Sequence, residues 1–185
     1  MVNYSAGAAA GLSARVQLIN SDGTVKWEKS ASLDSAEDSM AAPFKMEYPA
    51  GLTPVHFIRL ELRQGRKLVS DNFYWRGVEE ENYRALRALP KVAIDAATTS
   101  ERRGERWFLT TTLSNASQSP ALMVRLKAVR EKSGDRILPA IYSDGYVALM
   151  PGEKRVIATE LRDADTRGEK ARIVVEGFNV ASAER

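Results

Sequence analysis

The stretch from His56 to Trp75, HFIRLELRQGRKLVSDNFYW, decides the fold class of this chain. Ile58, Leu60 and Leu62 alternate with charged residues, and a period of two is typical of a strand with one buried face. Gly65 interrupts the alternation between polar neighbours, which indicates a turn. Apolar residues then resume and lead into a run of three aromatics. The stretch therefore predicts two strands joined by a short turn.

The same pattern extends outward in both directions. Upstream, Ala14, Val16 and Leu18 alternate with polar residues and precede Asp22-Gly23, a pair that adopts the positive φ angles of a hairpin turn at low cost. Downstream, strand-like segments follow at 107–113, 124–128, 137–142, 146–150, 156–161 and 173–178. Short strands at even spacing, separated by turn residues, are typical of a β-sandwich.

The segment Val78–Pro90, VEEENYRALRALP, breaks this pattern. Tyr83, Leu86 and Leu89 are three residues apart, and the acidic run Glu79–Glu81 precedes them. Acids favour the first turn of a helix, and a proline favours its end. The segment predicts a short helical linker whose three apolar residues pack between the flanking domains. The glutamate run is interpreted as the solvated start of that helix, not as a metal site.

Two strand-rich blocks on either side of this segment predict an all-β chain of two consecutive immunoglobulin-like β-sandwich domains. The expected boundaries are 1–77 for the first sandwich, 78–90 for the short helical linker and 91–185 for the second sandwich. No alternation of strands with helices occurs, so a parallel nucleotide-binding fold is not expected.

Composition excludes several classes of function. The chain has 27 Lys and Arg against 24 Asp and Glu among its 185 residues, a net charge of +3. Its basic residues alternate with acids, as in the stretch Arg59–Arg63, which predicts a solvated strand face and no nucleic-acid partner. No run of about 18 apolar residues exists, so no membrane partner is expected. The N-terminus lacks the pattern of a signal peptide.

Residues for catalysis are sparse. The chain has no cysteine, which excludes disulfides, thiolate metal sites and cysteine nucleophiles. The only histidine, His56, shares the strand parity of Ile58 and is predicted to be structural. Trp27, Trp75 and Trp107 have apolar neighbours, so core packing is favoured over a sugar platform. No catalytic residue, no cofactor and no metal site is predicted.

Four stretches carry a resemblance to a known family: GLTPVHFIRLELRQGRKLVSDNFYW (51–75), ENYRALRALP (81–90), RILPAIYSDGYVALMPGE (136–153) and VVEGFNV (174–180). In this order and spacing they resemble the C-terminal region of family 2 glycoside hydrolases, in the branch of β-mannosidase, endo-β-mannosidase and exo-β-glucosaminidase. Gly145 stands where that family usually has Asn, and Phe178 where it has Trp. A weaker match covers Gly11–Trp27.

The resemblance implies non-catalytic accessory domains that pack against a (β/α)₈ barrel of the same parent chain. That barrel carries the two catalytic glutamates of a retaining β-glycosidase, and this chain lacks it, so the chain itself is not expected to be an enzyme. The implied parent is periplasmic or secreted in a bacterium. The alternative is a free-standing carbohydrate-binding module, which would need exposed aromatic rings in line. An adhesin-like domain would fit the fold but not the four motifs.

The loop YSDGY, from Tyr142 to Tyr146, is the stretch most specific to the family. One interpretation is a hairpin turn in which Asp144 accepts bonds from nearby N–H groups and Gly145 supplies the positive φ. The other is a surface that leans on the barrel or meets glycan substrate at the rim. The candidate site residues are Tyr142, Ser143, Asp144 and Tyr146.

Overall fold

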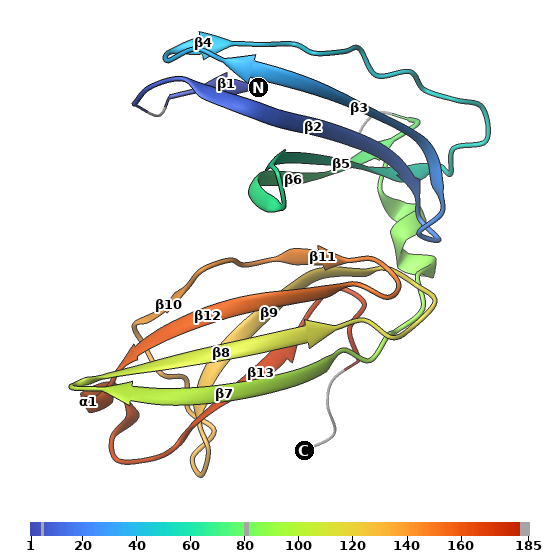
Figure 1. Ribbon diagram of the computed structural model, residues 1–185. Helices are drawn as coiled ribbons and strands as arrows, with labels where there is room; N and C mark the ends of the chain where they lie inside the picture. Colours follow the sequence, from blue (N-terminus) through green and yellow to red (C-terminus); the bar gives the residue numbers. More distant parts are fainter. Residues whose placement is uncertain (5, 80–81, 182–185) are drawn as a thin grey trace. The chain divides into compact units, whose positions relative to one another are not determined.

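A computed structural model describes residues 1–4, 6–79 and 82–181 (Figure 1). The chain forms two compact units, Met1–Ala88 and Leu89–Arg185. Both are built almost entirely of β-strands, so the predicted all-β class is confirmed. The finer boundaries at 77, 78, 90 and 91 stay a prediction.

The first unit contains a four-stranded antiparallel sheet in the order β3-β2-β5-β6. Its strands are β2 (Ala9–Asn20), β3 (Val25–Ser35), β5 (Val55–Gln64) and β6 (Lys67–Gly77). A separate short ladder pairs β1 (Val2–Asn3) with β4 (Ser39–Met40). Strands β5 and β6 are the two predicted from the stretch 56–75, and Gly65 has a φ of +56° in the turn between them.

One face of this sheet holds the predicted apolar row. Cross-strand pairing places Ile58 opposite Leu18 and Leu60 opposite Val16. Directly opposite residues share a face of an antiparallel sheet, so these side chains form one cluster. Phe44, from the segment between β4 and β5, packs against this cluster and removes it from water.

The opposite face is less solvated than the sequence predicts. Phe57 is fully buried there, and charged side chains on the same face pair with one another. Arg15 Nη2 lies 2.7 Å from Glu28 Oε2, and Arg63 Nε lies 3.3 Å from Glu61 Oε2. These charges therefore compensate one another, as the alternation of signs in the sequence indicates.

The linker helix differs from the prediction. It is a 3₁₀ helix of five residues, η1 (Arg84–Ala88), with no acid in its first turn. Asn82 precedes it, and its side-chain oxygen accepts a bond from the Arg84 N–H at 3.3 Å. The helix therefore begins after the glutamates, because the asparagine supplies the acceptor at its start. Two residues of the predicted acidic first turn, 80 and 81, lie outside the described residues.

The apolar residues of the linker were expected between the two domains. Leu86 is buried, whereas the ring of Tyr83 packs against Trp75 with 6.4 Å between centroids. The Tyr83 hydroxyl also donates to the Trp75 carbonyl at 3.4 Å. Tyr83 therefore packs within the first unit, and an interdomain role for Tyr83, Leu86 and Leu89 stays a prediction.

The second unit is a sandwich of two antiparallel sheets (Figure 1). The four-stranded sheet has the order β10-β12-β8-β7, from β10 (Ala140–Tyr142), β12 (Lys154–Arg162), β8 (Arg106–Ser114) and β7 (Asp95–Arg103). The three-stranded sheet has the order β11-β9-β13, from β11 (Val147–Leu149), β9 (Ala121–Arg130) and β13 (Ala171–Glu176). A short helix, α1 (Asp163–Thr166), joins β12 to β13.

The core of this unit lies between the two sheets. Leu113 and Ile157 from one sheet pack with Val124 and Leu126 from the other. The two ends of the unit are joined by Asn179, which is 2% exposed. Its side-chain nitrogen donates to the carbonyls of Pro90 and Pro120, and its oxygen accepts from Leu122 N–H. One buried amide thus fixes the start and the end of the unit to β9.

Candidate functional site

The four candidate residues lie on the connection between β10 and β11. These strands are edge strands of different sheets, so the loop crosses from one sheet of the sandwich to the other. Gly145 was expected to supply the positive φ, and this is wrong: Tyr146 has the positive value, +57°. The Gly145 N–H donates to Asp144 Oδ1 at 2.8 Å, and the left-handed backbone conformation occurs one residue later, at Tyr146.

Tyr142 and Ser143 form contacts within the sandwich. The Tyr142 hydroxyl, on one sheet, accepts a bond from Ala128 N–H on the other at 2.9 Å. Ser143 pairs twice with Ala158: its N–H donates to the carbonyl and its Oγ accepts from the N–H, each at 2.9 Å. Both residues therefore hold the strand that precedes the loop in place.

Asp144 also has its partners inside the unit. Its Oδ2 accepts a bond from Arg155 Nε at 3.0 Å, and Arg155 Nη2 contacts the same oxygen. The Asp144 side chain is 32% exposed and that of Arg155 is 29% exposed. The carboxylate is thus engaged on both oxygens, as expected for a residue that holds a turn.

Tyr146 presents the exposed ring of the loop. Its hydroxyl accepts a bond from Arg125 Nη1 at 2.8 Å, and the guanidinium lies 5.5 Å from the ring centroid. Arg125 also donates to Glu176, and Lys127 contacts the same carboxylate. The hydrogen bond from Lys127, and then that from Arg125, hold the pKa of Glu176 below its usual value. These contacts hold Tyr146 in the left-handed backbone conformation, which favours glycine.

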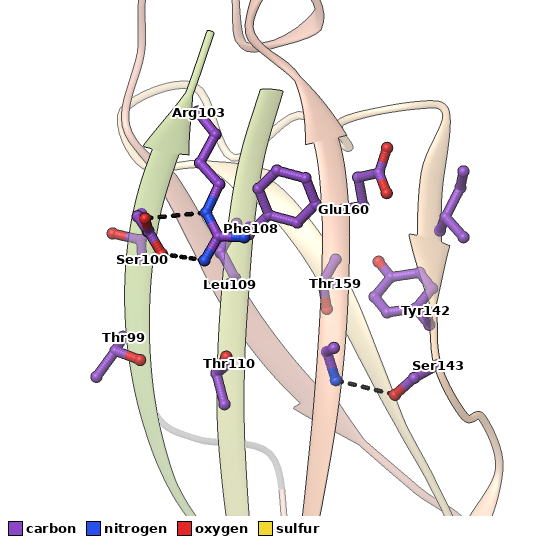
Figure 2. A pocket seen from close by; sticks show the side chains of 13 residues that line it. Thr99, Ser100, Arg103, Phe108, Leu109, Thr110, Tyr142, Ser143, Thr159 and Glu160 are labelled. Carbon is purple, nitrogen blue, oxygen red and sulfur yellow. Dashed lines mark hydrogen bonds and ion pairs between the residues drawn. The ribbon is translucent and has the colours of Figure 1, made fainter. Parts of the chain in front are cut away.

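The outer face of the four-stranded sheet contains a groove of about 570 Å³ beside this loop (Figure 2). Its floor is a row of small residues that crosses the sheet. Thr99, Thr110 and Ala158 lie on β7, β8 and β12, and Ser143 directly follows β10. A neighbouring row contains larger side chains, with Phe108 at its centre. The groove exists because small side chains in one row lie beside large ones in the next.

The carboxylates of the groove are already paired. Glu101 accepts two bonds from Arg103, at 2.9 and 2.7 Å, and this guanidinium lies 5.3 Å from the centroid of Phe108. Bonding to Arg103 lowers the pKa of Glu101. Glu160 pairs with Arg106. Each carboxylate of the groove is therefore held by an arginine of the same sheet.

The other sequence candidates are structural. His56 is 3% exposed, and its Nδ1 lies 3.4 Å from the Thr53 carbonyl, as the prediction of a structural histidine requires. Trp27, Trp75 and Trp107 are half-buried, and Trp107 Nε1 donates to Asp163 at 2.7 Å. Across residues 1–4, 6–79 and 82–181, no group of three or more His, Asp or Glu is placed to hold a metal ion. No helix in the same residues has the length and apolarity needed to cross a membrane.

The sequence alone does not indicate the groove or the network around Arg125. The alternation in the segment 107–113 does place Phe108 and Thr110 on the outer face. It does not indicate which residues of β7 and β12 lie beside them, because that depends on register between distant strands. In the sequence, nothing distinguishes Arg125 from the many other basic residues that are expected to be solvated.

Comparison with known proteins identifies relatives of the chain. Residues 72–180 match the family model described as the exo-β-D-glucosaminidase Ig-fold domain. An exo-β-D-glucosaminidase of Streptomyces avermitilis is 30% identical over 98% of this chain, and one of Amycolatopsis orientalis is 27% identical over 98%.

A crystal structure of the Amycolatopsis orientalis exo-chitosanase CsxA superposes with a TM-score of 0.91 at 26% identity, over 98% of this chain. The matched regions are 23% and 20% of the two glucosaminidases and 24% of the CsxA chain. The chain therefore spans less than a quarter of the length of these relatives.

Proposed function

The chain belongs to the exo-β-D-glucosaminidase immunoglobulin-fold family, and from this we infer that it is a non-catalytic accessory part of a larger glycoside hydrolase. The observation that carries the inference is the coverage: 98% of the chain aligns with 23% of a curated relative. A (β/α)₈ barrel needs roughly 250 residues and eight helices, and the sandwich architecture described above has a different plan. The proposed partner is the catalytic barrel of the same parent chain.

The proposed parent is a retaining β-glycosidase of the exo-β-glucosaminidase type. The relatives that align over nearly the whole chain carry that name, which favours it over the β-mannosidase type within the same branch. Retention needs two carboxyl groups about 5 Å apart. In the groove, Glu101 and Glu160 are separated by strand β8, or two interstrand spacings of about 4.8 Å each, and each is paired with an arginine. This separation supports a catalytic centre elsewhere in the parent.

The loop at 142–146 is the proposed contact with the barrel or with glycan at its rim. Tyr142, Ser143 and Asp144 use their polar groups within the sandwich and position the loop. Tyr146 is 57% exposed, so its ring is the part available to another surface. Tyrosines of this kind, with an apolar body and a polar tip, are enriched at protein interfaces.

An exchange of segments tests the accessory role. The matched segment of the Amycolatopsis orientalis enzyme is replaced by this chain, and a second variant lacks the segment altogether. We expect the chimera to hydrolyse p-nitrophenyl β-D-glucosaminide and the deletion to lose soluble, active enzyme. The isolated chain should release no nitrophenol. Release by the isolated chain, abolished by one carboxylate substitution, would contradict the proposal.

The groove favours carbohydrate binding as a second candidate function. It combines hydroxyl groups with the aromatic ring of Phe108, a lining suited to a saccharide. Calorimetric titration with glucosamine oligosaccharides tests this. Saturable binding that Phe108→Ala abolishes, and that Tyr74→Ala on the first unit preserves, would support a binding module. Absence of heat with the unmodified chain would exclude it.

A further inference from the structure

Strand β7 is exposed on both faces, which is unusual for a strand of a sandwich. All nine of its residues are exposed, including those whose parity directs them toward the core. Ala96 lies opposite the buried Leu113, and Ser100 lies opposite the buried Leu109, yet neither is covered. The physical reason is the strand count: three strands of one sheet face four strands of the other, and β7 is the edge of the larger sheet.

An edge strand presents a row of unpaired N–H and C=O groups to any strand that can align with it. Natural edges are commonly blocked by proline, by a bulge or by charges along the strand. Strand β7 contains no proline, and it pairs with β8 without a register shift from Asp95 to Arg103. Its charges stand only at its two ends, and the centre, 96–100, consists of alanine, threonine and serine.

We propose that β7 pairs antiparallel with β7 of a second copy of this chain, with Thr99 opposite the partner's Thr99. In this arrangement Asp95 lies opposite the partner's Arg103, and Arg103 lies opposite the partner's Asp95. The two four-stranded sheets become one continuous sheet across a two-fold axis. The charged residues at the two ends of β7 oppose its pairing with many other strands. In pairing with a second β7, each charge lies opposite a charge of the other sign and attracts it.

Charge complementarity selects this register from its neighbours. The outer face must continue across the axis, so the register changes in steps that keep side-chain parity. A shift of the register by one such step places Asp95 opposite the partner's Glu101, so that two negative charges face each other. One step in the other direction places Glu101 opposite the partner's Thr99 and leaves Asp95 beyond the pairing.

The side chains involved can take part in the contact. The Arg103 side chain is 66% exposed, and it pairs with Glu101 on its own strand. A guanidinium has five N–H donors, so Arg103 can keep that pair and also bind the partner's Asp95. The Asp95 side chain has no ion pair within the described part of the chain. A strand-to-strand contact alone buries little area, so the association is expected to be weak and reversible.

Sedimentation equilibrium of the 185-residue chain over a wide concentration range tests the proposal. We expect the average mass to rise from monomer toward dimer at high concentration. Asp95→Arg and Arg103→Asp each place like charges opposite one another at both ends, so each should weaken association by roughly ten- to a hundredfold. Lys132→Asp, in the exposed turn that follows β9 and outside the β7–β8 pair, is the matched control and should leave the association unchanged.

The mixture of the two single variants is the decisive sample. At one end of a mixed dimer, the arginine introduced by the first substitution faces the aspartate introduced by the second. At the other end, the unaltered Arg103 of one copy faces the unaltered Asp95 of the other, so mixed dimers should form where neither variant pairs alone.

Three outcomes would overturn the proposal. The first is a chain that stays monomeric at every concentration, and the second is a dimer unaffected by either charge reversal. The third is a mixture of the two variants that fails to associate. None of these outcomes depends on the proposed accessory function.

Discussion

Individual residues hold the second sandwich together by contacts between positions far apart in the sequence. Asn179 is the strongest case, because its buried side-chain amide forms hydrogen bonds with three backbone groups, one at Pro90 and two at Pro120 and Leu122. Asp144 and Arg125 act in the same way near the surface, where water competes with the contact.

Asn179→Ala should strongly destabilise the second unit. The substitution leaves the Pro90 and Pro120 carbonyls and the Leu122 N–H without their partner in a buried site. An unsatisfied buried group costs about 1–3 kcal/mol, so we expect a loss of at least about 2 kcal/mol in the free energy of unfolding. Urea denaturation measures it, with Gln118→Ala on the adjacent exposed turn as control. A loss no larger than the control's would show that water replaces the amide.

Asp144→Ala should lower stability only modestly. The pair with Arg155 is about one-third exposed on each side, so solvent screening limits its coupling to about 0.5–1 kcal/mol. A double-mutant cycle with Arg155→Ala measures this coupling by thermal unfolding. If the cycle shows no coupling while Asp144→Ala in the chimeric enzyme lowers kcat/KM, then Asp144 acts on the barrel or its substrate and not on its own turn.

At the scale of the element, strands β9 and β13 are joined by charge as well as by backbone bonds. Glu176, on β13, lies opposite Arg125 of β9 in the ladder, and it also contacts Lys127 of β9. The carboxylate therefore stabilises the pairing of these strands only while it is ionised. This gives the unit a defined response to acid.

Glu176→Gln should flatten the acid dependence of stability. The folded pKa of Glu176 is lowered from 4.5, so its contribution is present above that value and is lost as the pH falls through the lower folded pKa. The contribution is under about 1 kcal/mol because the group is partly exposed. Unfolding curves from pH 7 to about pH 3 compare the variant with Glu131→Gln, whose partner Lys170 is 3.7 Å away. Equal slopes for wild type and Glu176→Gln would refute the assignment.

At the scale of the whole molecule, the two compact units differ in construction. The second has two facing sheets and its own core, whereas the first has one large sheet with an irregular segment on one face. A core enclosed within 97 residues is in the range of independently folding domains. Stability should therefore be separable between the units.

Residues 89–185 expressed alone should fold and unfold cooperatively. The core cluster of this unit comes entirely from its own residues, so removal of the first unit leaves that core intact. Circular dichroism and a single urea transition measure the outcome. Asn179→Ala in the same fragment is the matched control and should weaken the transition. A fragment with no cooperative transition would show that the second unit depends on the first.

The sequence by itself determined the all-β class and those strands whose residues alternate between apolar and polar, but not strand β7. These follow from local physics: alternation at Ile58, Leu60 and Leu62 gives their strand one apolar face, and Asp22-Gly23 accepts the positive φ of a hairpin, +90° at Gly23. The four motifs also indicated the family, since their order depends on the chain alone. These signals need no knowledge of what a strand packs against.

Only the tertiary structure decided which distant residues meet. The buried ties of Asn179, the reversal at Tyr146 in place of Gly145, the groove beside Phe108 and the uncovered strand β7 all depend on register and on the number of strands in the facing sheet. A period of two tells which residues share a face, but every register that keeps parity satisfies it equally. The choice among those registers is made by packing across the sandwich, which is a property of the folded chain.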